Sequence, residues 1–306
     1  MARRASTAGL VAALAAALIG CGADRASGPP GSGLPTPEPG AIRVVTTTTV
    51  LADIVRAVGG TRTDVRSIVP PGVGPEDYEP KPDDARSLAD AQLIVSNGVG
   101  LDDFLDRLLS SGGSQARRLV LGAGLDPITV DGEPNPHFWL DPTIVATGYL
   151  PQIEKALADI RRDDANLFDA NAAAYAAELE RLDEDLKARI ETIPAASRKL
   201  VTFHDAFPYF ARHFGLELVG VVVANVGQEP TAAELAELVR TVKAARVKAV
   251  FSEAQFNPKL ARTLAEEAGI EKVVSTLYND ALGPPPADSY LGLMRWNVQQ
   301  IVDALR

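Results

Sequence analysis

Histidine is rare in this sequence, and one histidine has unusual neighbours. Only three histidines occur among 306 residues. His137 lies in the stretch PNPHFWLDP, bracketed by prolines and aromatic residues, with Asp141 four residues later, and His204 directly follows the run KLVTF. Imidazole nitrogens are common ligands of first-row divalent metals. The first question is therefore whether carboxylates accompany these two histidines.

Carboxylates stand at comparable places, close to the ends of short runs rich in Val, Ile and Leu. Glu76 follows the run VRSIV, Glu253 ends the run VFSE, and Asp280 follows the run KVVSTL. In open α/β sheets, ligands bind beyond the carboxyl ends of the strands. If two such sheets face each other, the two histidines and these carboxylates converge between them. Imidazole plus carboxylate, without a nucleophile, suits a first-row divalent metal.

Other chemistries lack their usual motifs. The sequence contains no G-x-S-x-G nucleophile elbow, and the GVG at residues 98–100 lacks the rest of a glycine-rich phosphate loop. The formal net charge of −10 disfavours nucleic acid and anionic membrane surfaces as partners. A metal-dependent hydrolase is an alternative to a metal-binding protein, because an open coordination position could activate water beside a base such as Glu253.

The elements that must position these side chains alternate between β-branched runs and helical patterns. This alternation predicts an α/β fold with mainly parallel sheets. We expect strands at residues 41–49, 65–71, 92–98, 117–122, 199–203, 216–223, 247–253 and 272–277. We expect helices at residues 50–60, 82–91, 101–109, 205–215, 231–245, 257–269 and 289–305. The third histidine, His213, falls inside one of these helices and is expected to be unrelated to the site.

A longer helix is predicted at residues 167–193, which contain neither Gly nor Pro. Leu179, Leu182, Leu186 and Ile190 recur at three- and four-residue spacing and form one apolar stripe. Such a helix is about 40 Å long, more than one small domain needs. It could be part of a hairpin packed on the first domain or a rigid rod that joins two lobes, and periodicity alone does not decide between these alternatives.

The N-terminus is typical of an exported lipoprotein. Residues 1–20 combine two arginines with a short apolar run and are predicted to be a signal peptide. The only cysteine, Cys21, ends this run and resembles a lipobox cysteine, which implies lipidation of its thiol. Residues 21–40 are rich in Gly and Pro and are predicted to form a flexible tether.

Six stretches together resemble a known family, the zinc- and manganese-binding receptor lipoproteins of metal ABC importers (cluster A-I solute-binding proteins). They are IVPPGVGPEDYEPKPDD, LADAQLIVSNGVGLDDFLDRLL, NPHFWLDP, VTFHDAFPYFARHFGLELVG, FSEAQFNPKLARTLAEEAGI and LYNDALG. The resemblance implies two βα, Rossmann-like lobes, at residues 41–150 and 194–306. It implies that residues 151–193 are linking helices that include a long rigid inter-lobe helix, with one metal bound between the lobes.

The resemblance also implies a ligand set. His137, His204 and Asp280 match the family's ligands in the NPHFWLDP, VTFHD and D-x-x-G stretches. Glu76 occupies the remaining ligand position, where most relatives have histidine, and the histidine-rich loop common in zinc importers is absent before NPHFWLDP. Asp141 and Glu253 are expected to support the site rather than to bind the metal.

Two imidazoles and two carboxylates form a harder site than three imidazoles and one carboxylate. We therefore expect Mn²⁺ as the bound ion, with Zn²⁺ a close second and Fe²⁺ a third candidate. The expected protein is a non-enzymatic monomer outside the cytoplasm, at the cell surface or in the periplasm. Its expected partners are an ABC permease and, through the lipid on Cys21 only, the membrane. The alternatives are the hydrolase and an adhesin-like lipoprotein whose metal site degenerated when histidine became Glu76.

Overall fold

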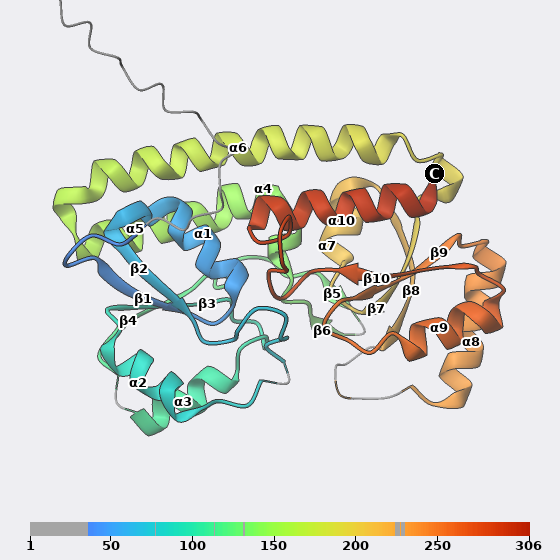
Figure 1. Ribbon diagram of the computed structural model, residues 1–306, viewed down its shortest axis with the longest axis horizontal. Helices are drawn as coiled ribbons and strands as arrows, with labels where there is room; N and C mark the ends of the chain where they lie inside the picture. Colours follow the sequence, from blue (N-terminus) through green and yellow to red (C-terminus); the bar gives the residue numbers. More distant parts are fainter. Residues whose placement is uncertain (1–35, 77, 113, 131, 224–226, 228–229) are drawn as a thin grey trace, which may run out of the picture. The chain divides into compact units, whose positions relative to one another are not determined.

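Parallel strands connected by helices build both halves of the protein in a computed structural model (Figure 1). The structure describes residues 36–306 except residues 77, 113, 131, 224–226 and 228–229. All of the described residues belong to one compact unit, Pro35–Arg306. The predicted α/β fold with mainly parallel sheets is confirmed.

The N-terminal half contains a four-stranded parallel sheet in the order β2-β1-β3-β4. Its strands and helices are β1 (Ile42–Thr46), α1 (Thr49–Gly59), β2 (Thr63–Ser67), α2 (Pro82–Asp90), β3 (Leu93–Ser96), α3 (Phe104–Gly112), β4 (Arg117–Val120) and α5 (Leu150–Ile160). Side chains on both faces of β1 are buried: Val44 packs in the larger core with α1, and Val45 packs in the core with α2 and α3. Burial on both faces is the usual state of a parallel sheet.

The C-terminal half contains two parallel strand pairs, β7 with β8 and β9 with β10. Because β7 also lies beside β9, the two pairs are neighbours. The elements are β7 (Lys199–His204), α7 (Pro208–Phe214), β8 (Glu217–Val223), α8 (Ala232–Ala245), β9 (Ala249–Glu253), α9 (Lys259–Ala268), β10 (Lys272–Leu277) and α10 (Tyr290–Leu305). A capping box begins α8, with Thr231 and Glu234 bonded reciprocally.

The long helix α6 (Ala165–Glu191) packs against α1 and α5 of the N-terminal half and against α7 and α10 of the C-terminal half (Figure 1). Its predicted apolar stripe, from Leu179 to Ile190, is buried. One continuous helix therefore contacts both halves, which is the rod arrangement and not a hairpin packed on one domain. The helix ends before Pro194 because the residue preceding a proline disfavours helical backbone.

Three local features differ from the expectations. A small antiparallel hairpin, β5 (Thr129–Val130) with β6 (Glu133–Pro134), precedes the His137 turn and was not predicted. Helix α3 begins later than residue 101, because the Asp102 carboxylate accepts hydrogen bonds from the backbone amides of Asn97 and Gly98 and holds a turn there. The short segments α4 (Pro142–Ile144) and η3 (Val145–Tyr149), which were not predicted, lead from the His137 turn into α5.

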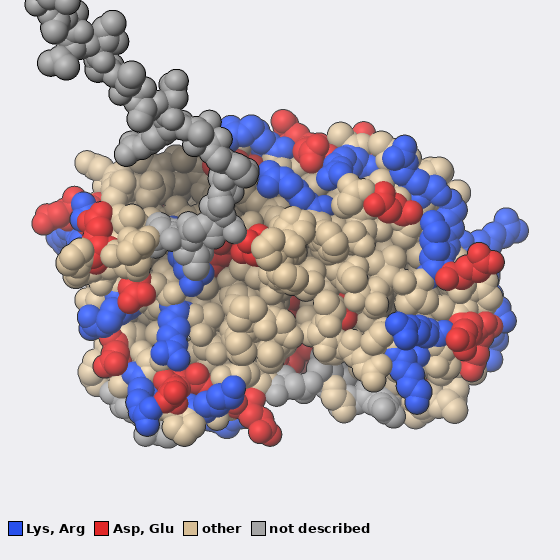
Figure 2. Space-filling view, in the orientation of Figure 1, with Lys and Arg blue, Asp and Glu red and all other residues tan. Residues whose placement is uncertain are grey.

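The predicted signal peptide, residues 1–20, and the predicted lipidation site, Cys21, lie outside the described residues. Glu38, inside the predicted tether, is attached to the folded unit through Thr61 and Arg62, with its Oε1 2.7 Å from Thr61 Oγ1. Of the helices that the structure describes, none has both the length and the apolar character needed to cross a membrane. Acidic and basic side chains are interspersed around the outer parts of the face in Figure 2, whose middle is mainly uncharged.

Candidate metal centre

The two histidines expected to bind metal line one pocket of about 280 Å³. Both are only 2% exposed, so they lie at the inner end of the pocket. Three carboxylates, those of Glu76, Glu133 and Asp205, also line it. The remaining lining residues are Val130, Pro134, Asn135, Pro136 and Val221. The pocket thus joins the β5–β6 hairpin and the His137 turn to the ends of β7 and β8.

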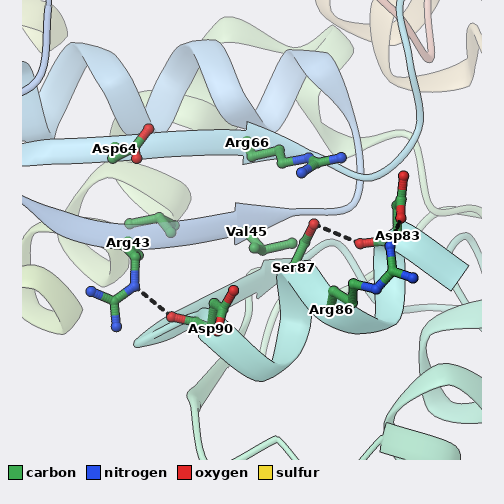
Figure 3. Close-up of a pocket in the computed structure, with 9 residues that line it drawn as sticks. Arg43, Val45, Asp64, Arg66, Asp83, Arg86, Ser87 and Asp90 are labelled. Atoms are coloured by element: carbon green, nitrogen blue, oxygen red, sulfur yellow. Dashed lines mark hydrogen bonds and ion pairs between the residues drawn. The ribbon is translucent and has the colours of Figure 1, made fainter.

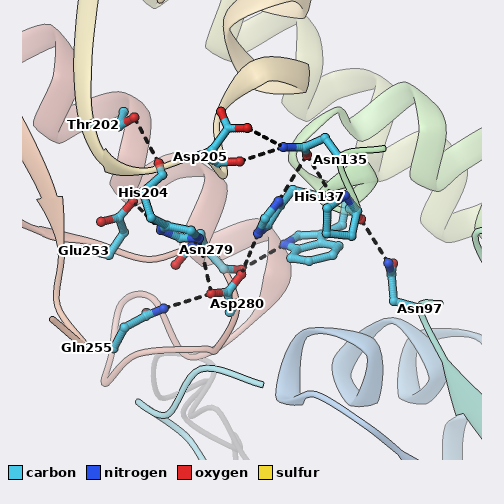
Figure 4. A network of polar contacts seen from close by, with 12 residues as sticks. Asn97, Asn135, His137, Thr202, His204, Asp205, Glu253, Gln255, Asn279 and Asp280 are labelled. Carbon is cyan, nitrogen blue, oxygen red and sulfur yellow. Dashed lines mark hydrogen bonds and ion pairs between the residues drawn. The ribbon is translucent and has the colours of Figure 1, made fainter. Parts of the chain in front are cut away.

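His137 and Asp280 face each other across the junction between the two halves (Figure 4). The Nε2 atom of His137 lies 3.3 Å from Oδ1 of Asp280, and the Asp280 side chain is 0% exposed. Apart from this contact with each other, neither atom has a hydrogen-bond partner among the described residues. Two donors bound about 2.1 Å from one ion lie about 3.0 Å apart at a right angle and about 3.4 Å apart at the tetrahedral angle. The pair is therefore spaced as two ligands of one cation would be.

The orientation of the His137 ring is fixed by Asn135, which was not predicted. His137 Nδ1 lies 3.1 Å from Asn135 Oδ1, which can only accept a hydrogen bond, so Nδ1 carries the proton and Nε2 is left with its lone pair. The Asn135 amide nitrogen donates to the backbone oxygen of Asp205, at 2.7 Å, and to its carboxylate, at 3.1 Å. Asn135 therefore connects His137 to Asp205, the residue that follows His204.

His204 and Glu253 end neighbouring strands, β7 and β9, which brings their side chains together. The Nδ1 atom of His204 lies 3.1 Å from Oε1 of Glu253, and Nε2 lies 3.7 Å from Oδ2 of Asp280. Burial alone would lower the pKa of His204, but the nearby carboxylates of Glu253 and Asp280 raise this pKa to about 10. Glu253 thus contacts the ring nitrogen that faces away from Asp280.

The loop that carries Asp280 is held on several sides. Gln255 donates a hydrogen bond of 2.9 Å to Asp280 Oδ2, which leaves Oδ1 directed at His137. The D-x-x-G spacing has a steric reason: a Cβ atom on Gly283 would lie 2.4 Å from the ring of Tyr278. Glycine at this position lets the loop fold closely on that ring.

Glu76 reaches the same site from the loop after β2. Its carboxylate, an imidazole nitrogen of His137 and an imidazole nitrogen of His204 all lie within 4.8 Å of one another. Glu76 itself is exposed, unlike the two histidines. Two residues earlier, a Cβ atom on Gly74 would lie 3.5 Å from Gln255 Nε2 and 3.8 Å from Asp280 Oδ2. The loop therefore lies against the Asp280 side of the site as well.

Asp141, which was expected to support the site, lies at the start of α4 beside His213. It caps α4, because its Oδ1 accepts from the Thr143 amide at 2.9 Å, and it lies 3.1 Å from Nδ1 of His213. His213 Nε2 lies 2.5 Å from Oδ1 of Asp183 on α6. The third histidine, expected to be unrelated to the site, thus connects the end of the His137 turn to the long helix, but it does not join the four predicted ligands.

A second pocket, of about 310 Å³, lies over β1, β2 and α2 (Figure 3). Arginine and aspartate side chains dominate it, and several pair with each other or with backbone: Arg43 donates to the Asp90 carbonyl at 2.6 Å, and Arg86 pairs with Asp83. Its lining residues are Arg43, Val44, Val45, Asp64, Arg66, Asp83, Arg86, Ser87 and Asp90. Because no imidazole or thiolate is among them, the His137 pocket is the better candidate for a transition-metal site.

Donor types and unsatisfied buried atoms both fit a divalent cation at the His137 pocket. Two imidazoles come from different halves of the fold, and Glu76 and Asp280 add hard oxygen donors. Buried polar atoms normally have hydrogen-bond partners, and among the described residues His137 Nε2 and Asp280 Oδ1 contact only each other, at 3.3 Å, which is consistent with a cation between them. The arrangement can hold one cation away from bulk water.

The chain is similar to known proteins along most of its length. The family model of the periplasmic zinc-uptake complex component A matches residues 44–304. The manganese-binding lipoprotein MntA of Halalkalibacterium halodurans is 32% identical over 97% of this chain and 96% of its own length. The iron ABC transporter substrate-binding lipoprotein MtsA of Streptococcus pyogenes is 28% identical over 90% of this chain and 92% of its own length.

Solved structures show the same fold. The periplasmic zinc-binding protein TroA of Treponema pallidum superposes with a TM-score of 0.80 and is 26% identical, over 87% of this chain and 99% of its own. The manganese-bound periplasmic metal-binding protein of Candidatus Liberibacter asiaticus gives a TM-score of 0.78 at 26% identity, over 87% of this chain and 100% of its own. The chain belongs to the family of zinc-uptake component A proteins, the metal-binding substrate receptors of ABC importers.

Proposed function

We propose that this protein captures one divalent transition metal outside the cytoplasm and delivers it to the permease of an ABC importer. The observation that carries the proposal is the pair His137 Nε2 and Asp280 Oδ1, two buried atoms from different halves of the fold that lie 3.3 Å apart without other hydrogen-bond partners among the described residues. Glu76 and His204 complete the proposed ligand set. The relatives support the proposal, since their names describe binding proteins for manganese, iron and zinc.

Mn²⁺ is the proposed ion, followed by Zn²⁺ and Fe²⁺. Two carboxylates among four ligands favour a hard ion relative to a site of imidazoles alone, although the general affinity order still favours Zn²⁺ over Mn²⁺. Selection between the ions therefore depends on coordination geometry as well as on donor type.

A carrier role fits the site better than hydrolysis. Glu253, the residue best suited to act as a base, is 0% exposed and contacts the His204 ring, so it is not positioned beside a substrate in the pocket. The proposed site holds its ion among buried side chains and uses no nucleophile from the chain. Metal-loaded protein should accordingly leave model esters and phosphoesters intact. Metal-dependent turnover that Glu253→Gln abolishes would favour the hydrolase.

The proposal also covers how the protein is attached to the membrane and how its chain is divided into lobes. Cys21 is the proposed lipid attachment site, with residues 1–20 removed as a signal peptide, so that the membrane holds the protein through lipid alone. We propose a monomer that docks on its permease. The approximate boundaries are residues 41–150 and 194–306 for the two lobes and 151–193 for the linking helices.

Uptake of radioactive Mn²⁺ by cells of the host that lack this chain tests the proposal. The wild-type chain should restore uptake, and Asp280→Ala should not, although both chains reach the membrane fraction. Cys21→Ser should release the protein from that fraction. Equal uptake with and without the wild-type chain, for Mn²⁺, Zn²⁺ and Fe²⁺ alike, would overturn the importer function.

A further inference from the structure

Asn279 is a buried polar residue at the candidate metal centre whose role the four proposed ligands do not explain. It is 0% exposed, and its side-chain oxygen Oδ1 has no hydrogen-bond partner among the described residues. Its side-chain nitrogen Nδ2 lies 3.1 Å from Nε2 of His204 (Figure 4). An amide oxygen buried without a partner is destabilising, so the position calls for an explanation.

The backbone around Asn279 is held in place by residues from other elements. Trp139 Nε1 donates a hydrogen bond of 2.9 Å to the carbonyl of Asn279. The preceding residue, Tyr278, is held by Asn297 of α10, whose Oδ1 accepts from the Tyr278 amide at 3.0 Å. These bonds fix the point from which the Asn279 side chain projects. The side chain is therefore pre-positioned beside His204 and the adjoining ligand Asp280.

The contact between Asn279 and His204 is incompatible with a bound ion in its present form. Because His204 Nδ1 faces Glu253, Nε2 is the ring nitrogen that would offer its lone pair to the ion. The Asn279 amide nitrogen now lies 3.1 Å from that same ring nitrogen. When an ion takes the lone pair, the amide must turn. A turn of 180° exchanges the positions of its nitrogen and oxygen and places the oxygen about where the nitrogen was.

The resulting position suits a metal ligand. The 3.1 Å between the amide atom and His204 Nε2 is close to the separation of two donors at right angles on one ion, about 3.0 Å, and it is shorter than the tetrahedral separation. Right angles between neighbouring ligands belong to five- and six-coordinate ions. An amide oxygen is also a hard donor of the kind that Mn²⁺ accepts, whereas Zn²⁺ prefers four ligands with nitrogen or sulfur among them.

We propose that the side-chain oxygen of Asn279 is a fifth ligand of the transported ion and that it favours Mn²⁺ over Zn²⁺. The inference rests on the proposed function, because it requires that Glu76, His137, His204 and Asp280 hold the ion. It adds a hard oxygen donor and a higher coordination number. In the metal-free protein the Asn279 amide nitrogen instead occupies the place beside His204 Nε2, and Oδ1 has no hydrogen-bond partner among the described residues.

Affinities for Mn²⁺ and Zn²⁺ separate this role from a structural one. The full chain in detergent would be titrated against a chromophoric chelator as wild type, Asn279→Ala, Asn279→Ser and the control Asn171→Ala. Asn171 is a suitable control because its amide donates to the Val58 carbonyl at 2.9 Å, on helix α1. We expect Asn279→Ala to weaken Mn²⁺ binding by about tenfold or more and Zn²⁺ binding by less than about threefold, while the control changes neither.

If Asn279→Ala lowers the affinities for Mn²⁺ and Zn²⁺ by the same factor, or lowers neither, the fifth ligand is overturned but the receptor function stays intact. No metal binding by the wild type would overturn both. If Asn279→Ala does not fold, Asn279→Ser carries the same comparison. A crystal structure of the manganese-loaded wild type gives an answer that does not depend on variants: the Asn279 oxygen bonded to the ion supports the proposal, and an amide turned away from the ion contradicts it.

Discussion

His204 Nδ1 and Glu253 Oε1 lie 3.1 Å apart at the ends of two neighbouring strands, both nearly inaccessible to solvent. This relationship fixes which nitrogen of His204 can bind a metal. A carboxylate that accepts from Nδ1 holds the ring in place and increases the basicity of Nε2. The support comes from the strand ladder itself and not from a loop, so the ring is held by a rigid part of the fold.

Replacing Glu253 should therefore weaken metal binding without removing a ligand. We expect Glu253→Gln to lower the affinity for Mn²⁺ by about 10- to 100-fold, the usual effect of losing a partner of a ligating histidine. Competition with a chelator measures the change. Glu217→Gln, at the exposed start of β8, is the matched control. An unchanged affinity in Glu253→Gln would show that the contact does not support the ligand.

Glu76 stands at the proposed ligand position where this chain differs from the pattern that it resembles. Glu76→Ala should weaken binding of Mn²⁺, and Glu76→His should shift the preference toward Zn²⁺, because imidazole is a softer donor than carboxylate. The ratio of Mn²⁺ to Zn²⁺ affinity is the readout. Glu79→Ala removes a second exposed carboxylate from the same loop and should change nothing. If Glu76→Ala and Glu79→Ala behave alike, Glu76 is not a ligand.

His213 lies between the carboxylates of Asp141 and Asp183, and these contacts make the stability of the fold depend on pH. Burial alone would lower the pKa of His213, but hydrogen bonds to Asp141 and Asp183 outweigh burial and raise it. The folded protein therefore holds this proton more tightly than the unfolded chain. The resulting stabilisation is complete below the unfolded pKa of about 6.5 and is lost as the pH rises through the higher folded pKa.

We expect His213→Gln to lower the free energy of unfolding of the metal-free protein by about 2 kcal/mol at pH 6, since charged hydrogen bonds to two carboxylates are lost. The deficit should shrink as the pH rises above the folded pKa. Urea unfolding in the presence of a chelator measures both effects. Glu184→Gln, next to Asp183 on the exposed side of α6, is the control. A deficit that does not change with pH would contradict a protonated His213.

Hydrogen bonds between the two halves predict that metal binding causes little closure. Leu282 of the C-terminal half donates through its amide to Thr49 Oγ1 at 2.8 Å, and the amide of Tyr290 donates to Asp53 Oδ2 at 2.8 Å. Helix α6 also contacts both halves. Solution scattering should therefore show a radius of gyration that changes by less than about 1 Å on addition of Mn²⁺. A larger decrease, absent from Asp280→Ala, would indicate hinged closure instead.

Local patterns in the sequence predicted the elements and the strand-end positions well. The apolar stripe of α6 and the apolar run before His204 are local patterns, and each was enough to predict its helix or strand. Periodicity could not place α6 across both halves, and the resemblance to a family supplied that conclusion. The ligand set also depended on the resemblance, because the sequence alone showed only that histidines and carboxylates follow strands.

The sequence did not predict the polar partners of the proposed ligands. Gln255 and Asn279 contact Asp280 and His204, which are distant in the sequence. Asn135 contacts the nearby His137 and the distant Asp205. A single asparagine or glutamine in a loop carries no distinctive pattern. His213 gave no sign of its partners either, since its helix position is compatible with a plain surface residue. One signal was available: Asn135 stands two residues before His137 in a turn stiffened by prolines.

The most direct test of the central claim is the metal content of the full chain, measured by mass spectrometry after chelation and exposure to equimolar Mn²⁺, Fe²⁺ and Zn²⁺. The structure predicts one ion per wild-type chain, and none in a His137→Ala, Asp280→Ala double variant with an unchanged circular dichroism spectrum. Wild-type protein without stoichiometric metal, or a double variant that retains one ion, would contradict a site formed by these residues.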